Sequence, residues 1–228
     1  MSESRGPERG VALIIVLLVM LTLSALAMAL ALLTSTETRV AAAYRDGLEV
    51  LYATDAAVER AIRDLAMEPD IDSVLSGLTT SSFIDGPPGS RMLPDGSSTD
   101  LHSLTGVVNC GRAVCSDADL DAEGDDRPWG PNNPRWRLYA YGSVEARAAG
   151  PAREPKVYQV VWIADDPSET DGDPTRDGGG VAGAESPGRG RLSLLAHGYG
   201  RSGTRRIVEA TVMVEDEGSR LVSWREVR

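Results

Sequence analysis

A long run without charged residues lies near the start of the chain. From Val11 to Leu33 every side chain is uncharged and most are aliphatic. As an α-helix this run would span roughly 34 Å at about 1.5 Å per residue, enough to cross the hydrocarbon core of a bilayer. Arginines at positions 5 and 9 favour a cytoplasmic N-terminus, although glutamates at positions 3 and 8 weaken that charge bias. The pattern therefore predicts a membrane-spanning helix over residues 11–34.

Two simpler interpretations of this segment stay open. Ala25 and Ala27, and again Ala29 and Ala31, offer the small-x-small pattern of a secretory cleavage site. The segment would then be a Sec signal peptide that is lost from the mature protein. It would alternatively be a single-pass anchor that is never processed. Against a signal peptide, the apolar run exceeds the usual core of about 7–15 residues, and the helical pattern continues beyond it.

The periodicity predicts that the helix extends well past the apolar run. Apolar or aromatic residues recur at steps of three and four, which places them on one helix face. They are Val40, Tyr44, Leu48, Leu51, Val58, Ile62 and Leu65. Asp55 interrupts this stripe, and charged residues occupy the opposite face. Because Pro69 cannot continue a helix, we expect one helix from near Val11 to Met67, amphipathic over residues 35–68.

The remainder, residues 69–228, is predicted to form one β-rich domain. Five runs with the character of strands are separated by turn residues, and they cover residues 136–145, 156–164, 191–198, 205–214 and 220–227. The second run is apolar at odd and even positions, so both of its faces should be buried. Loops are predicted over residues 85–100, 116–134 and 165–190. The fold class is therefore α+β, with the amphipathic half of the long helix packed on an antiparallel sheet.

The motifs give no support for catalysis. Gly198 to Gly203 match G-x-G-x-x-G, but they lie between two predicted strands, so we expect a hairpin turn and not a nucleotide site. The sequence contains no P-loop, G-x-S-x-G or H-E-x-x-H motif. Its two histidines, His102 and His197, belong to no recognisable constellation. We expect that the protein is not an enzyme.

Charge limits the range of partners. The formal net charge is -11 and the sequence pI is about 4.7, with the acidic residues spread through the second half. Such a surface repels phosphate backbones, so nucleic acid is not an expected partner. With one phenylalanine in the chain, the core must consist of aliphatic residues with a few Trp and Tyr.

Cys110 and Cys115 are the two cysteines of the chain. Exported proteins oxidise such a pair, and the spacing is not that of a redox C-x-x-C motif. A metal site would need more ligands nearby, and His102 alone does not supply them. We therefore expect a disulfide that closes a short loop and contributes about 2–3 kcal/mol in the chain-entropy model.

An acidic cluster follows the second cysteine. Its carboxylates are Asp117, Asp119, Asp121, Glu123, Asp125 and Asp126. The alternation resembles the start of a Ca2+ loop, but Ala122 stands where an EF-hand requires glycine and Pro128 where it requires glutamate. A solvated acidic loop and a calcium site both stay open. A weaker acidic series lies at Asp171, Asp173 and Asp177.

Residues 9–14, RGVALI, resemble the class III signal of type IV pilins and type II secretion pseudopilins. In those families a prepilin peptidase cleaves after the glycine on the cytoplasmic side and methylates the new N-terminus. The resemblance implies that residues 1–10 are a prepilin leader, with Gly10 as its last residue and Val11 as the first mature residue.

Three further segments extend this resemblance to the N-terminal region of PilX-type minor pilins, over residues 5 to about 65. They are residues 34–41 (TSTETRVA), 44–46 (YRD) and 53–59 (ATDAAVE). One departure is Ile15, at the fifth mature position, where major pilins carry a glutamate that meets the N-terminal amine of a neighbouring subunit. A buried charge is costly without such a partner, and the K-type pseudopilin at the filament tip also lacks it. The resemblance thus implies a role at the tip or in initiation.

The resemblance implies a minor pilin of a type IV pilus or of a related secretion pseudopilus. Such a protein is anchored in the bacterial inner membrane by one helix and carries its C-terminal domain in the periplasm. Its partners would be other pilins or pseudopilins, the prepilin peptidase and membrane lipid. The residues by themselves keep a second hypothesis open, in which a Sec-exported extracellular binding domain, calcium-dependent or not, never joins a filament.

Overall fold

The computed structural model describes residues 8–125, 127–143, 156–167, 173–178, 189–215 and 218–227. The chain divides into two compact units, Met1–Arg45 and Asp46–Arg228. Helix α1 (Glu8–Leu65) contributes residues to both units.

The described part of the first unit is helical throughout. Its side chains from Gly10 to Leu33 are exposed, and almost all of them are apolar. Thr34, Thr36 and Thr38 donate their hydroxyls to the carbonyl four residues earlier, at 2.8–3.0 Å, so these polar groups are satisfied within the helix. Among the described residues, the helical stretch Gly10–Leu65 is long and apolar enough to cross a membrane, judged by length and composition. The long helix expected from the sequence is confirmed.

Helix α1 ends at Leu65, two residues before the predicted end at Met67. Its last turn tightens, because the amides of Met67 and Glu68 donate to the carbonyls of Asp64 and Leu65 at 3.2 and 3.1 Å. Pro69 has no amide hydrogen to donate and its ring crowds the preceding turn, so the helix stops here.

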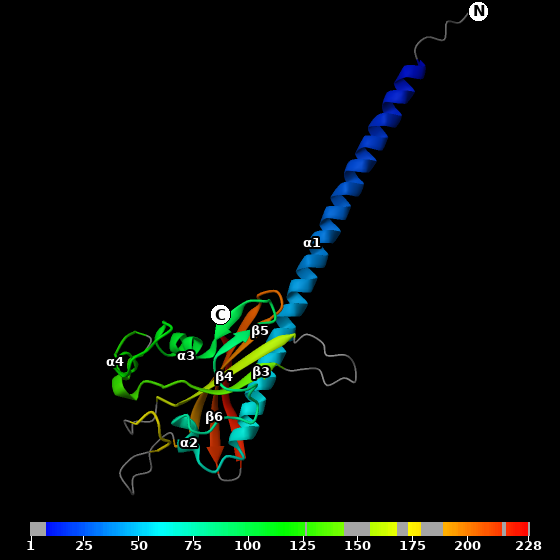
Figure 1. Cartoon of the computed structure of the whole chain (residues 1–228). Coiled ribbons are helices and arrows are strands. Elements are labelled where there is room, and N and C mark those ends of the chain that lie inside the picture. Colours follow the sequence, from blue (N-terminus) through cyan, green and yellow to red (C-terminus); the bar gives the residue numbers. More distant parts are fainter. Residues whose placement is uncertain are drawn as a thin grey trace, which may run out of the picture. The chain divides into compact units, whose positions relative to one another are not determined.

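A five-stranded antiparallel sheet dominates the second unit, with the strand order β3-β4-β5-β6-β7 (Figure 1). The strands are β3 (Arg137–Ser143), β4 (Val157–Asp165), β5 (Arg191–Gly200), β6 (Arg205–Glu215) and β7 (Gly218–Val227). Each strand pairs with its neighbour in sequence, so the sheet is a meander. All five strands predicted from the sequence are present. The predicted end of the first run at Glu145 lies outside the described residues.

The G-x-G-x-x-G sequence forms the hairpin between β5 and β6. Tyr199 pairs with Arg205, and the amide of Gly200 donates to the Thr204 carbonyl at 2.8 Å. The hairpin prediction is therefore correct.

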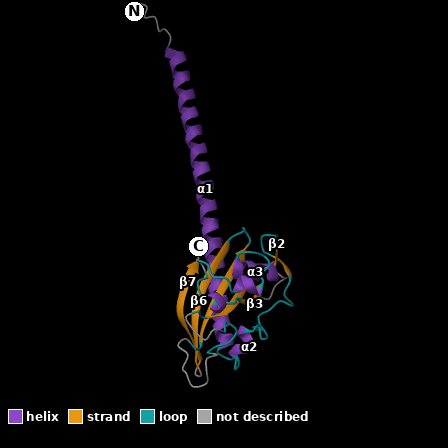
Figure 2. Ribbon diagram, turned by 90° about the vertical axis from the view of Figure 1, so that its left-hand side faces the viewer, coloured by secondary structure: helices purple, strands orange, loops and turns teal. Residues whose placement is uncertain are grey.

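One face of the sheet packs against α1 from residue 46 onward and against α2 (Ile71–Leu75), and Figure 2 shows the strands as a layer beside this part of α1. The buried α1 residues with side chains are Val50, Thr54, Ala57, Val58, Ala61, Ile62 and Leu65. Alanine and threonine at three of these positions let the helix backbone approach the strands closely. The sheet and the second half of α1 thus share one core, as the α+β prediction requires.

The predicted apolar stripe of α1 is only partly the buried face. Leu48 and Leu51 are half-buried, while Val40 and Tyr44 in the first unit are exposed. Asp55, which interrupts the stripe, lies at its flank and accepts a hydrogen bond from Trp224 Nε1 of β7 at 2.9 Å. The prediction relied on large apolar residues, but close contact between the helix and the sheet favours small ones.

The opposite face of the sheet packs against α3 (Leu101–Cys110). Leu101 is fully buried against Tyr141, Tyr158 and Trp162, and Trp162 Nε1 donates to Thr105 Oγ1 at 2.9 Å. Every residue of β4 is buried, as expected for a strand covered on both faces.

Several short elements occupy segments that were predicted as loops. The segment 85–100 contains the paired strands β1 (Ser90–Met92) and β2 (Ser98–Asp100), and 116–134 contains α4 (Asp117–Leu120) and the 3-10 helix Gly130–Asn132. Helix α3 was also missed, since LHSLTGVVNC combines a glycine with β-branched residues of low helix propensity. It is held by the Asp100 side chain, which accepts from the Ser103 amide at 2.8 Å, and by left-handed Gly111 at its C-terminus.

Candidate functional site

The disulfide predicted from the sequence is present between Cys110 and Cys115, whose Cα atoms lie 6.2 Å apart. It joins the C-terminal end of α3 to the residue before the N-cap of α4. The intervening loop folds back onto α3 at Gly106, where a Cβ would overlap the backbone of Ala113 and Arg112. Glycine at this position therefore allows the loop to lie against the helix.

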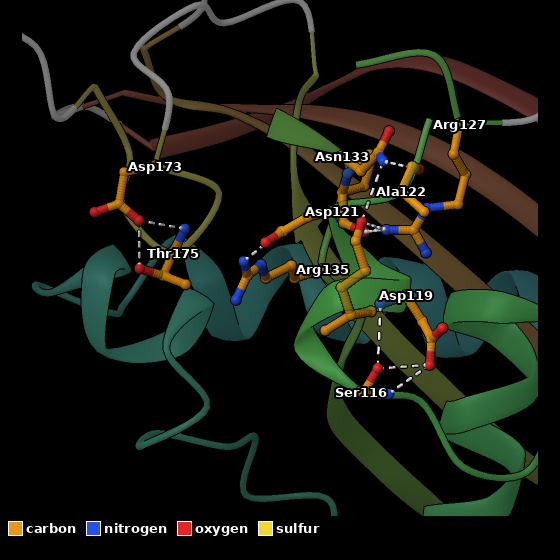
Figure 3. Close-up of polar contacts among 11 residues, drawn as sticks. Ser116, Asp119, Asp121, Ala122, Arg127, Asn133, Arg135, Asp173 and Thr175 are labelled. Carbon is orange, nitrogen blue, oxygen red and sulfur yellow. Dashed lines mark hydrogen bonds and ion pairs between the residues drawn. The ribbon is translucent and has the colours of Figure 1, made fainter. Parts of the chain in front are cut away.

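The first carboxylates of the acidic cluster organise α4. Asp119 accepts hydrogen bonds from the amide and the hydroxyl of Ser116, at 2.9 and 2.8 Å, and Ser116 Oγ accepts from the Asp119 amide (Figure 3). This reciprocal arrangement is a capping box. The hydrogen bonds from Ser116 lower the pKa of Asp119, and the ion pair with Arg112 acts in the same direction. Asp117 lies in the first turn of α4, where the helix dipole favours negative charge.

The backbone of the loop that carries the acidic cluster is held by two residues, Asn133 and Arg127, that the sequence analysis did not single out. Asn133 is buried, and its amide nitrogen donates to the carbonyls of Leu120 and Ala122 at 3.1 and 2.9 Å (Figure 3). Its oxygen accepts from the Trp129 amide at 3.1 Å. Arg127 donates to the carbonyls of Leu120 and Pro134 at 3.0 and 3.1 Å. The acidic loop is thus ordered by an amide and a guanidinium.

The carboxylates of the cluster have different partners and do not converge on one point. Asp121 forms an ion pair with Arg135 at 2.9 Å, whereas Asp119 caps α4 (Figure 3). Within the described residues, no group of three or more His, Cys, Asp or Glu side chains is placed to hold a metal ion. Calcium binding by Asp117, Asp119, Asp121, Glu123 and Asp125 stays a prediction from the sequence. Asp126 and Asp171 lie outside the described residues.

The weaker acidic series also serves local structure. Asp173 Oδ1 accepts from the Thr175 amide at 3.1 Å and from its hydroxyl at 2.6 Å (Figure 3). Asp177 accepts from the Gly190 amide at 2.5 Å, and its own amide donates to Asp72 at 2.9 Å. These carboxylates stabilise turns at the end of the sheet.

A cavity of about 690 Å³ opens beside the acidic loop, and we call it the Trp129 pocket. Its walls come from the C-terminal end of α3, the acidic loop and the α3 side of the sheet, which we call the outer face. The side chains that line it include Arg112, Glu123, Asp125, Trp129, Trp136 and Arg225. Trp136 is fixed in the wall by Asn109, whose side chain bonds to both the amide and the carbonyl of Trp136 at 2.9 and 3.0 Å.

The two histidines are far apart in character. His102 is exposed, whereas His197 is buried between the rings of Trp162 and Tyr199. Burial, aided by the positive charge of Arg205, lowers the pKa of His197 to about 4, so the ring is neutral at pH 7. Its Nδ1 lies 3.1 Å from the Tyr199 hydroxyl. His197 therefore serves the packing of the sheet's outer face.

The residues predicted for processing lie near the start of α1. Gly10 and Val11 are both helical and exposed, and nothing lies within 4 Å of a Cβ placed on Gly10. The apolar side chains that follow remain exposed, so this surface requires lipid or other helices to cover it.

Residues 9–59 match the family model described as PilX N-terminal. The N-terminal region of the chain is PilX-like. The match covers the apolar segment and most of the part of α1 that packs on the sheet. No curated protein and no solved structure matches the chain.

This match supports a relation to pilins of the type IV pilus over the N-terminal region of the chain. Its apolar helix fits a membrane-anchored pilin. Ile15 has 55% of its surface exposed in the isolated chain.

Proposed function

We propose that the protein is a PilX-like minor pilin that takes part in the assembly or tip formation of a type IV pilus or a related secretion pseudopilus. One observation carries the proposal: residues 9–59 match the PilX N-terminal model, and they lie in a continuous helix whose first part exposes only uncharged side chains from Val11 to Leu33. The function of such a protein lies in helix packing and not in catalysis.

The processing proposal follows from the same region. A prepilin peptidase would remove residues 1–10, and Val11 would become the methylated N-terminus. Before assembly the apolar helix would cross the inner membrane, with the second unit in the periplasm. The Cys110–Cys115 disulfide supports this location, because such bonds persist in oxidising compartments.

Assembly would transfer the apolar helix from lipid into a bundle with other pilins. Ala25, Ala27, Ala29 and Ala31 are exposed and small, and small residues permit close approach of helices in an apolar environment. The partners are therefore other major or minor pilins, or pseudopilins.

Ile15 supports a position at the tip. A subunit inside the shaft would bring a glutamate at this position to the N-terminal amine of its neighbour, and isoleucine cannot form that ion pair. A subunit at the tip has no subunit above it, so its isoleucine leaves no neighbouring amine buried without a carboxylate. An amine buried in this way would cost several kcal/mol.

N-terminal sequencing and intact mass of the protein from native membranes test the processing step. We expect a mature chain that begins at Val11 and carries one added methyl group. Gly10→Asp should retain the leader, whereas Gly6→Asp, a matched change within the leader, should not. A start at Met28 or Leu32 would instead identify a Sec-exported domain, and an intact Met1 would identify an unprocessed anchor.

Immunogold labelling of filaments tests the position. We expect label at filament ends for the wild type, and label along the shaft for Ile15→Glu, which restores the charge for the neighbouring amine. Label along the whole wild-type shaft would contradict the tip assignment and leave the pilin assignment intact.

A further inference from the structure

The Trp129 pocket is not explained by helix packing in a filament. It lies in the second unit, between the disulfide loop, the acidic loop and the outer face of the sheet. Its volume of about 690 Å³ is within the range of about 300–1,000 Å³ that is usual for sites that bind small molecules.

The arginines of the pocket are already engaged. Arg112 forms an ion pair with Asp119, and Arg225 donates to Glu209 Oε2 through Nη2 and Nε at 2.6 and 3.1 Å. Arg127 donates through Nη2 to two backbone carbonyls, which fix its position but do not compensate its positive charge. Ion pairs therefore compensate two of these three arginines.

Two carboxylates of the pocket are not engaged. Glu123 and Asp125 are exposed side chains of its wall, and among the described residues neither has a hydrogen bond or an ion pair. The loop that carries them is held by Asn133 and Arg127, so its shape does not depend on these carboxylates. The wall carries four carboxylates and three arginines, so its net charge is -1 and a cation is the favoured ligand.

Two indoles complete the pocket. Trp129 is 45% exposed, and Trp136 is partly buried against the core of the outer face. The face of an indole attracts a cation within about 6 Å, and the attraction strengthens where water is excluded. Indoles together with carboxylates favour an organic cation, since calcium requires six to eight oxygen ligands.

We propose that the Trp129 pocket binds an alkylammonium group, the cation at the end of a lysine side chain. The ammonium would lie between the carboxylates of Glu123 and Asp125, and the methylene stem would pack on Trp129. The pocket would thus be a recognition site for a basic group, independent of the helix contacts that build a filament.

Isothermal titration calorimetry on the full chain in detergent tests the proposal. The probe is acetyl-Gly-Lys-Gly-amide, and the matched neutral probe carries norleucine in place of lysine. We expect saturable 1:1 binding of the lysine peptide, weakened by added NaCl, and no binding of the norleucine peptide. Equal binding of both peptides, or binding of neither, would overturn the proposal.

Variants locate the binding site. Glu123→Gln and Trp129→Ala should each weaken binding of the lysine peptide by about fivefold, which corresponds to about 1 kcal/mol. Glu59→Gln, a change of an exposed carboxylate on α1, and Trp224→Phe on β7 should leave it unchanged. If Glu123→Gln binds as tightly as the wild type, the assignment to this pocket is wrong.

Two competitors identify the source of the cation and test the calcium alternative. If butylammonium displaces the peptide at a concentration similar to that of the peptide, the site binds small amines. If much more butylammonium is needed, the site also recognises the peptide that carries the lysine. Both outcomes agree with the proposed chemistry. Stoichiometric binding of CaCl2 that abolishes peptide binding would assign these carboxylates to calcium and overturn the proposal.

Discussion

Replacing Gly198 by alanine should destabilise the second unit, because α1 lies directly against this position of β5. A Cβ on Gly198 would overlap Thr54 Oγ1 and would lie 3.1 Å from Val50 Cγ1 and 3.2 Å from the Val50 carbonyl oxygen. The backbone of Gly198 is one that alanine can adopt, so the cost comes from packing.

The neighbour cannot move aside freely. Thr54 is fully buried, and its hydroxyl donates to the Val50 carbonyl at 2.7 Å. Overpacking of this kind costs about 1–3 kcal/mol, of which alanine recovers roughly 0.5–1 kcal/mol through its better backbone entropy. From the midpoints of these two ranges, the free energy of unfolding should fall by about 1 kcal/mol, which lowers the melting temperature by about 2–4 °C.

Urea denaturation in a double-mutant cycle measures this effect. Thr54→Ala removes the atom that a new Cβ would meet first, so the penalty of Gly198→Ala should shrink in that background. Gly124→Ala serves as a control, since nothing lies within 4 Å of its Cβ position. The reasoning is refuted if Gly198→Ala is as stable as the wild type, or if its penalty is the same in both backgrounds.

Three further changes probe the core and the acidic loop. The stability that neutral His197 contributes is fully present above pH 6.5 and is lost as the pH falls to about 4, because the unfolded chain then binds a proton that the folded chain does not. The loss amounts to about 3 kcal/mol of unfolding free energy. Denaturation at pH 7 and pH 4 measures it, and His197→Gln should not show this loss. Asn133→Ala removes the donor to two carbonyls and the acceptor of one amide, so the loop should lose about 1–3 kcal/mol, seen as faster hydrogen exchange at residues 119–124, while unchanged exchange would contradict its role. The double change of Cys110 and Cys115 to serine should lower the free energy of unfolding by about 2 kcal/mol in urea, and an unchanged midpoint would show that the closed loop does not constrain the unfolded chain.

Patterns that repeat along the chain predicted most of the architecture. A charge-free run and a stop at Pro69 were enough to place α1, since helix formation depends on contacts within a few residues. Alternation and turn residues likewise placed β3 to β7 and the hairpin at Gly200. The short spacing of Cys110 and Cys115 predicted their disulfide.

Features that depend on distant neighbours were not predictable in this way. Asn133 orders the acidic loop through residues eleven and thirteen positions away, and nothing in the local sequence distinguishes it from a solvated asparagine. Helix α3 has weak intrinsic propensity and is held by caps and by burial of Leu101 against the sheet. The Trp129 pocket likewise joins residues 108 to 225, which only the folded chain brings together.

The sequence by itself determined that this protein has a PilX-like apolar helix followed by the strands of an antiparallel sheet, because hydrophobic period and charge are local properties. The tertiary structure decided which side of that helix is buried. There the small residues Thr54, Ala57 and Ala61 pack on the sheet. Thr54 lies opposite Gly198 of β5. Hydrophobicity alone does not predict this face. The helix backbone can lie closest to the strands where the side chains between them are small, and this depends on the size of residues on both elements.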